Sequence, residues 1–285
     1  MKNETDLQHL AHLWGASAIP FGPMGEKDWL DTPAVEKIFG HLNQTAVLRS
    51  ALLLSGPNGV GKSALAGRWL RSLDQRLFHP LCLTQATLSG SGILGSLATK
   101  LGKPASFRRE RNLQLIEEAL AELERRIWIV VLDEAQNFAH SALEEVRLLL
   151  GLNLPQAPAF ALVLIGDEYL LSSLKLRNHR ALFSRLACQS SLAPWNGAQC
   201  AQYLSGALQA AGLSAQVVEP VASELLSAAS GGLPRSLNLL ARAAWIQAAT
   251  QGAQKISAAH VQHALESVPC VPGLNTAPPL PSPPP

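Results

Sequence analysis

The chain has 285 residues, of which 47% are hydrophobic and 15% are charged, and its formal net charge is +2. Such a composition is typical of a globular protein with a sizeable core and excludes a chain that is disordered throughout. The small net charge excludes a general affinity for polyanions, so any nucleic-acid surface must be a local patch. The four cysteines have no paired C-x-x-C spacing and indicate thiols in a reducing compartment rather than a disulfide framework.

Two features of the sequence predict a cytoplasmic protein without a membrane anchor. The N-terminus lacks the continuous apolar core of a signal peptide. The uncharged run 148–166 has the length of a membrane span, but Asn153, Pro155 and Pro158 divide it into a helix end, a loop and a strand.

Residues 1–45 are expected to form an N-terminal lead-in with short helices. Asp31-Thr32-Pro33 predicts a helix start, because a capping side chain precedes a proline whose missing N–H would be unpaired there anyway. The helix that follows would turn Val35, Ile38 and Phe39 towards the core.

A phosphate-binding loop follows the apolar strand at 51–55. The spacing G-x-x-x-x-G-K-S is formed by Gly56, Pro57, Asn58, Gly59, Val60, Gly61, Lys62 and Ser63. Its glycines let the backbone approach phosphate, and backbone N–H groups with the N-terminus of the next helix would hold the oxyanions. Lys62 would contact the β- and γ-phosphates, and Ser63 would bind Mg²⁺. We therefore predict a site for ATP and magnesium, with the helix running to about Leu73.

Alternating strands and helices predict a doubly wound α/β domain with a parallel sheet over residues 46–194. The expected strands lie at 81–84, 127–132 and 159–165, in addition to 51–55. Helices are expected at about 113–123 from apolar spacing and at 141–150 from the capping-box spacing of Ser141 and Glu144. The segment 90–111 between them is rich in small residues and then basic.

Acidic residues follow two of these strands, where the carboxyl ends of parallel strands form the ligand-binding edge. Asp133, directly after strand 127–132, would hold Mg²⁺ together with Ser63. Glu134 would orient or deprotonate the attacking water. Asp167, after strand 159–165, could sense the γ-phosphate if a metal, water or cation lies between the two negative charges.

Helices are expected throughout residues 198–266, at 198–211, 220–229, 235–251 and 257–266. They would form a small helical domain over residues 195–267, and the proline-rich residues 268–285 would form a disordered tail. Arg235 lies in the first turn of a helix, where a cation gains nothing from the helix dipole, so an anionic partner is expected. Near the end of the α/β domain, Arg185 is the first candidate for an arginine that stabilises phosphoryl charge on a neighbouring subunit, and Arg180 is the second.

These residues resemble the motifs of the AAA+ ATPases: Walker A at 56–63, Walker B at 130–134, an arginine finger at Ser184-Arg185 and sensor 2 at 232–235. Residues 133–137 (DEAQN), 145–149 (EVRLL), Trp14-Gly15 and Pro20-Phe21 are similar to the ExeA/GspA-like branch, which includes secretion ATPases and TniB, TnsC and MuB-like transposon ATPases. Residues 166–170 read GDEYL where this branch usually reads GQPEL. The resemblance implies a P-loop fold with a helical lid and ATP bound between the subunits of a ring or filament. Arg185 would then act on a neighbour's ATP and Arg235 on its own.

Three functions are compatible with the resemblance. In the first, the chain is a transposition helper that assembles on double-stranded DNA and recruits or activates a transposase, with the basic segment 100–111 as a candidate DNA contact. In the second, it is a secretion or envelope-assembly ATPase that works on proteins. In the third, it is a nucleotide switch with slow turnover.

Overall fold

The computed structural model describes residues 2–25, 29–84, 89–123, 126–152 and 158–268. The chain forms two compact units, an α/β unit from Asp31 to Ala193 and a helical unit made of residues 1–30 and 194–285. The expected lead-in of residues 1–45 is thus divided between the two units, because its first helix packs on the C-terminal helices and its second packs on the sheet. The proline-rich end of the chain, 269–285, lies outside the described residues.

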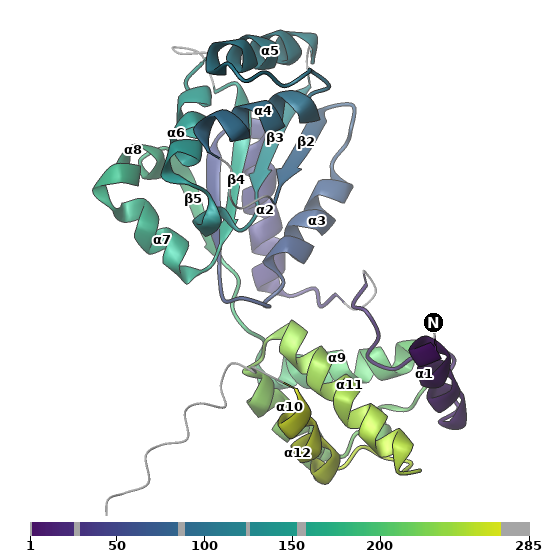
Figure 1. Ribbon diagram of the computed structural model, residues 1–285. Coiled ribbons are helices and arrows are strands. Elements are labelled where there is room, and N and C mark those ends of the chain that lie inside the picture. The colour runs from purple at the N-terminus through teal and green to yellow at the C-terminus, as the bar shows by residue number, and fades with distance from the viewer. Residues whose placement is uncertain (1, 26–28, 85–88, 124–125, 153–157, 269–285) are drawn as a thin grey trace, which may run out of the picture. The chain divides into compact units, whose positions relative to one another are not determined.

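The α/β unit contains a five-stranded parallel sheet in the order β2-β3-β4-β1-β5 (Figure 1). Because all strands are parallel, their carboxyl ends lie at one edge, with Ser55 beside Gly166 and Leu132 beside Leu164. The strands are β1 (Ala51–Ser55), β2 (Phe78–Leu83), β3 (Ile127–Leu132), β4 (Phe160–Gly166) and β5 (Leu186–Ser191).

The two outer strands depart from the sequence-based expectation. β2 begins three residues before the predicted start and contains Pro80, which an edge strand tolerates because one side of its backbone carries no ladder. β5 was not predicted at all. Its sequence, LACQSS, alternates between exposed positions and half-buried or buried ones along the other edge, and it has no continuous apolar run.

Helices cover both faces of the sheet (Figure 1), with α2 and α3 on one face and α4, α5 and α6 on the other. The start of α2 is as predicted, because Thr32 Oγ1 accepts a hydrogen bond from Val35 N. The helices of this unit are α2 (Pro33–Leu48), α3 (Lys62–Ser72), α4 (Gly90–Lys100), α5 (Arg109–Glu122), α6 (His140–Leu149), α7 (Glu168–Lys175) and α8 (Arg180–Phe183), with 3-10 turns η2 (Ala135–Asn137) and η3 (Arg177–His179).

Two helices differ from the prediction. α4 forms within the small-residue segment, where Ser89 caps the helix and Leu94 and Leu97 are buried in the core. The predicted capping box of α6 is wrong, because that helix begins at His140 without a side-chain cap. Ser141 instead accepts a hydrogen bond from Gly90 N, and Glu144 pairs with Arg147.

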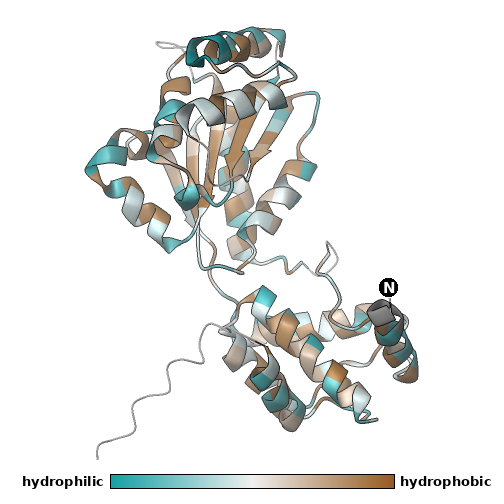
Figure 2. Cartoon of the chain, in the orientation of Figure 1, coloured by the Kyte–Doolittle hydropathy of each residue, from teal (hydrophilic) through white to brown (hydrophobic). Residues whose placement is uncertain are grey.

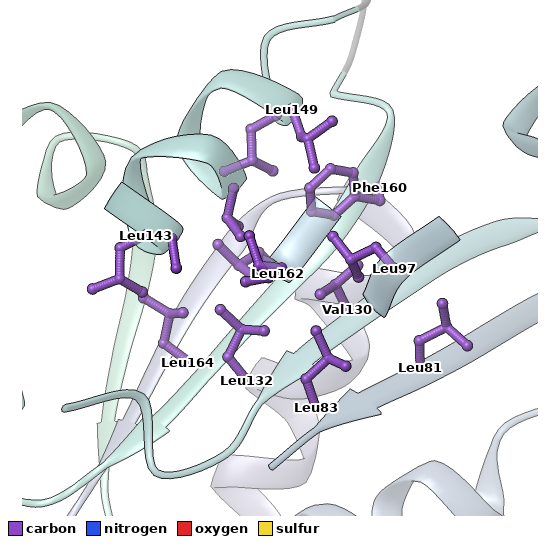
Figure 3. Close-up of a cluster of buried hydrophobic side chains, with 14 of the residues drawn as sticks. Leu81, Leu83, Leu97, Val130, Leu132, Leu143, Leu149, Phe160, Leu162 and Leu164 are labelled. Atoms are coloured by element: carbon purple, nitrogen blue, oxygen red, sulfur yellow. The ribbon is translucent and has the colours of Figure 1, made fainter. Parts of the chain in front are cut away.

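The main core lies between the sheet and α4, α5 and α6. Figure 3 shows leucines of α4 and α6 packed against alternate residues of β2, β3 and β4. The intervening residues of the central strands are also buried, against α2 and α3, and the strands are mainly brown in Figure 2. Burial on both faces explains why β3 and β4 could be recognised as continuous apolar runs.

The helical unit packs around α11. Its helices are α1 (Lys2–Leu13), α9 (Gly197–Ala210), α10 (Pro220–Ser230), α11 (Pro234–Thr250) and α12 (Ala258–Ser267), with the 3-10 turn η4 (Ala215–Val217). The four helices predicted between 198 and 266 are therefore confirmed. The N-terminal segment is held to α11, where Asn238 Nδ2 donates to Gly22 O at 3.0 Å and Arg242 Nε donates to Phe21 O at 2.6 Å. Among the described residues, no helix combines the length and apolar character that crossing a bilayer requires.

Candidate nucleotide-binding site

The loop between β1 and α3 has a backbone that requires glycine at its start. Gly56, Gly59 and Gly61 have φ angles of 153°, 85° and 105°. A Cβ on Gly56 would lie 2.4 Å from Leu192 O, in the backbone beyond β5, so no larger residue fits there. Gly61 precedes α3 without a side-chain cap, which leaves the first N–H groups of the helix available to an anion.

Lys62 is the first residue of α3 and is only 5% exposed. Its Nζ donates to Gly56 O at 2.8 Å and to Pro57 O at 3.0 Å, so the ammonium is drawn into the curve of the loop. Ser63 is exposed directly beside it. A buried cation, helix N–H groups and a hydroxyl converge at one turn, which is the donor set that a polyphosphate with magnesium needs.

Asp133 lies at the carboxyl end of β3, on the same edge of the sheet as Lys62. Asp133 is 8% exposed, and its backbone N–H donates to Leu83 O at 2.9 Å. β4 lies between β1 and β3, so two interstrand spacings, about 10 Å, separate the ends of these strands. No ion pair of Asp133 is found among the described residues. A buried carboxylate and a hydroxyl are oxygen ligands of the kind that Mg²⁺ prefers, so Asp133 and Ser63 fit that ion.

Glu134 has the left-handed backbone conformation, with φ 54° and ψ 43°. A residue with a side chain adopts this conformation at a cost and keeps it only where its surroundings fix it. Its N–H donates to Asp133 Oδ1 at 3.0 Å, and its carbonyl accepts from Asn137 N at 2.9 Å. These two bonds fix the turn that begins at Glu134.

Gln136 is a polar residue of this edge to which the sequence reasoning gave no role. Its Nε2 donates to Glu134 Oε2 at 2.7 Å, and its Oε1 accepts from Asp167 N at 3.4 Å. Periodicity and strand-end reasoning could not identify it, because it lies in a 3-10 turn beyond the end of β3. The side chain of Asp167 serves as the N-cap of α7, accepting from Leu170 N at 3.0 Å.

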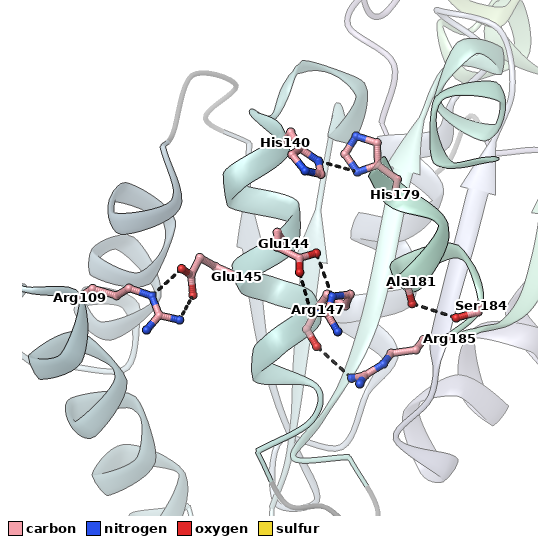
Figure 4. Close-up of polar contacts among 9 residues, drawn as sticks. All are labelled: Arg109, His140, Glu144, Glu145, Arg147, His179, Ala181, Ser184 and Arg185. Atoms are coloured by element: carbon pink, nitrogen blue, oxygen red, sulfur yellow. Dashed lines mark hydrogen bonds and ion pairs between the residues drawn. The ribbon is translucent and has the colours of Figure 1, made fainter. Parts of the chain in front are cut away.

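The two arginine candidates between β4 and β5 have different surroundings. Arg185 is half-buried, and its Nη1 donates to Arg147 O at 2.9 Å near the end of α6 (Figure 4). It therefore satisfies one of the carbonyls that a helix C-terminus leaves unpaired. Arg180, at the start of α8, is exposed and has no hydrogen-bond or ion-pair partner for its side chain within the part of the chain that is described.

Arg235 lies in the helical unit, at the second residue of α11, and is exposed. The turn before it is built from Gly231 and Gly232, with φ angles of 59° and 70°. A Cβ on Gly232 would lie 2.0 Å from Trp195 O, so the backbone packs too closely there for any other residue. The predicted helix start at Arg235 is thus fixed by tight packing of the preceding turn.

The basic segment 100–111 is largely neutralised by acidic neighbours. Arg109 forms a two-bond ion pair with Glu145 of α6, at 2.6 and 2.8 Å (Figure 4). Lys103 pairs with Glu122, and Arg111 lies 3.5 Å from Glu118. The exposed side chains of Lys100 and Arg108 lack such partners among the residues with described positions.

The chain is similar in sequence to several known proteins. Residues 47–174 match a family model described as an AAA domain. General secretion pathway protein A of Aeromonas hydrophila is 28% identical over 211 residues, which cover 72% of this chain and 38% of that protein. The ATP-dependent target DNA activator B of Escherichia phage Mu is 27% identical over 158 residues, which cover 55% of this chain and 48% of that protein. The chain thus spans less than half the length of either relative.

Solved structures show the same fold. The ORC1 protein of Aeropyrum pernix, solved in complex with DNA, has a TM-score of 0.65 and 21% identity, covering 84% of this chain and 66% of that one. Cdc6p from Pyrobaculum aerophilum has a TM-score of 0.68 and 20% identity, covering 87% of this chain and 70% of that one. Residues 47–174 thus match the AAA domain family model, and the chain has the fold of P-loop NTPases.

Proposed function

We propose that this protein binds ATP with magnesium at the loop 56–63 and hydrolyses it to ADP and phosphate. The observation that carries the proposal is the burial of Lys62 and Asp133, which are 5% and 8% exposed, at the same edge of the sheet. Burying two ionised side chains costs free energy, and a magnesium polyphosphate would compensate both.

Each residue of the edge has a distinct role in this reaction. Lys62 and the first N–H groups of α3 hold the β- and γ-phosphates. Ser63 and Asp133 would hold Mg²⁺, which would neutralise charge on the phosphate oxygens. Glu134 accepts a proton from the water whose oxygen attacks the γ-phosphorus, while the bond from that phosphorus to the bridging oxygen of ADP breaks. Asp167 acts on the phosphate through a water, because its carboxylate is already engaged in capping α7.

Turnover depends on a second copy of the chain, which assembles with the first into a ring or filament. An arginine from the neighbouring copy stabilises the charge that develops on the γ-phosphate. Arg235, exposed at the start of α11, binds an anion. Exposure favours Arg180 as the neighbour's arginine, since a side chain that reaches another molecule must be free to do so. Arg185 is the alternative and would first have to leave Arg147 O.

The assembled protein acts on double-stranded DNA as a helper that recruits or activates a transposase. The likeness to the target DNA activator of phage Mu supports this assignment. The exposed side chains of Lys100 and Arg108 are the members of the basic segment that supply phosphate contacts. The likeness to General secretion pathway protein A supports a second candidate, an ATPase that works on a protein of a secretion apparatus.

The first experiment measures ATP hydrolysis by the full chain with and without duplex DNA, at several protein concentrations. Hydrolysis per subunit is expected to rise with concentration and with DNA, and Glu134→Gln is expected to bind ATP and lose turnover. A chain that retains no nucleotide in the presence of DNA would exclude the proposed reaction.

The second experiment separates the two candidate partners by the salt dependence of DNA binding. Replacing Lys100 and Arg108 together by alanine is expected to lower the slope of log K against log salt by about two, because each side chain neutralises one phosphate. Arg109→Ala is the matched control, because its charge is already paired with Glu145. Salt-independent DNA binding, or none, would favour the protein-directed ATPase.

A further inference from the structure

We infer that Gln136 is a positioning residue that aims the carboxylate of Glu134 at the attacking water. This inference rests on the proposed hydrolysis of ATP and deepens it. Three features of the structure carry it: the fixed backbone of Glu134, the two hydrogen bonds of the Gln136 amide, and the glycine at the end of β4.

The backbone of Glu134 is held, but the backbone alone does not fix its carboxylate. Two hydrogen bonds hold the left-handed turn at Glu134, which settles the direction in which the side chain leaves the chain. Beyond Cβ, a glutamate has further rotatable bonds that a turn cannot restrict. A base that must meet one water needs a second restraint near its carboxylate.

The Gln136 amide provides that restraint through Glu134 Oε2. Gln136 Nε2 donates to this oxygen at 2.7 Å. Glu134 Oε1 has no partner within the described residues, so it is the oxygen left to accept a proton from water. One oxygen is thus anchored and the other remains available, which gives the carboxylate a defined orientation.

The other end of the amide is bound to Asp167, directly after β4, which settles which way the amide points. Gln136 Oε1 accepts from Asp167 N at 3.4 Å, and a backbone N–H requires an acceptor there just as a carboxylate requires a donor. A Cβ on Gly166 would lie 2.7 Å from Gln136 Oε1, so the amide reaches this place because residue 166 is glycine. Gln136 therefore spans from the end of β3 to the end of β4 and ties Glu134 to the adjacent strand.

The experiment compares Gln136→Met with the unmodified full chain in the DNA-stimulated ATPase assay. Methionine keeps the length and packing of the side chain and removes both hydrogen bonds. We expect kcat to fall about ten-fold, because a small misplacement of a catalytic group is costly, while the Kd for a non-hydrolysable ATP analogue changes less than about two-fold. Gln136→Asn, which keeps the amide on a shorter stem, is expected to recover part of the lost rate.

A double-variant cycle with Glu134→Gln tests whether Gln136 acts through Glu134. In the Glu134→Gln background, Gln136→Met is expected to lower the residual rate less than about two-fold, because the group that it aims is gone. Equal losses in both backgrounds, or no loss of kcat in Gln136→Met alone, would overturn the inference while leaving the proposed function intact. If the unmodified chain does not hydrolyse ATP, or if Glu134→Gln hydrolyses it normally, the proposed function itself fails.

Discussion

The two units of this protein differ in the kind of polar side chain that they bury. In the α/β unit, Lys62 and Asp133 are charged and buried at the ligand-binding edge of the sheet. In the helical unit, Tyr203 and Asn238 are buried and uncharged, and Tyr203 Oη donates to Asn238 Oδ1 at 2.7 Å. Burying a charge lowers stability more than burying a paired neutral group, so the first arrangement indicates a binding function and the second a structural one.

We expect the largest effect from replacing Lys62. This substitution tests whether the buried charge is needed for turnover rather than for stability. Lys62→Met is expected to lower ATP turnover by about 10²- to 10³-fold, as for the loss of one preorganised donor to the transferring group. The melting temperature of the nucleotide-free protein should change little, because removing a buried charge offsets the loss of the two hydrogen bonds to Gly56 O and Pro57 O.

Tyr203→Phe is the matched control in the helical unit. It leaves Asn238 Oδ1 without its donor, so a loss of about 1 kcal/mol in the free energy of unfolding is expected, with ATP turnover unchanged. A marked loss of stability in Lys62→Met would show that the lysine has a structural role and would remove the difference between the units.

The second prediction concerns close packing in the helical unit. Gly232→Ala places a Cβ 2.0 Å from Trp195 O at a residue with φ 70°, so a loss of about 3 kcal/mol or more is expected. Gly252→Ala is the control, because its φ of 69° is similar and nothing lies within 4 Å of the added Cβ, so that only about 1 kcal/mol is expected. Hydrogen exchange followed by mass spectrometry should show faster exchange in α9–α12, with β1 and β3 unchanged. Equal effects of the two substitutions would contradict the packing argument.

The third prediction separates the two arginines of the α/β unit. Arg185→Ala leaves Arg147 O near the end of α6 without its partner, and we expect a loss of about 1 kcal/mol in stability. Arg180→Ala should leave stability unchanged and lower only the turnover of the assembled protein. Mixing an arginine-deficient chain with the Glu134→Gln chain measures which arginine acts between copies. Activity restored by mixing identifies a residue that acts on a neighbour.

Sequence reasoning succeeded where one physical signal dominated. Doubly buried strands such as β3 and β4 are continuous apolar runs, and the P-loop requires glycines at set positions, so both could be identified. It failed where contacts distant in sequence decide the structure. β5 exists because it completes an edge beside β1, and Ser141 bonds Gly90 across 51 positions instead of capping its own helix. Gln136 accepts a hydrogen bond from Asp167, 31 residues later, and no local sequence pattern predicts that contact.

The smallest expected effect is on the pH dependence of stability. It also distinguishes the units, because His79 and His179, whose pKa values are lowered, both lie in the α/β unit. Burial, together with the nearby His140, lowers the pKa of His179 from its ordinary value of 6.5, against the opposing charge of Glu144. His140 Nδ1 lies 3.3 Å from His179 Nδ1, beside the Glu144–Arg147 ion pair (Figure 4). The unfolded chain therefore binds a proton that the folded chain resists, and stability should fall as the pH drops below 6.5.

The contribution of His179 to the slope of the free energy of unfolding against pH is at most about 1.4 kcal/mol per pH unit, the limit for one proton. Burial and Arg126 also lower the pKa of His79, so the unmodified chain shows both contributions. His179→Asn should remove the part that belongs to His179 and leave the part that belongs to His79. The measurement is the free energy of unfolding in urea at several pH values between about 5.5 and 7.5, the range in which histidine titrates. If His179→Asn has the same pH dependence as the unmodified chain, the contact between α6 and η3 does not depend on the protonation of His179.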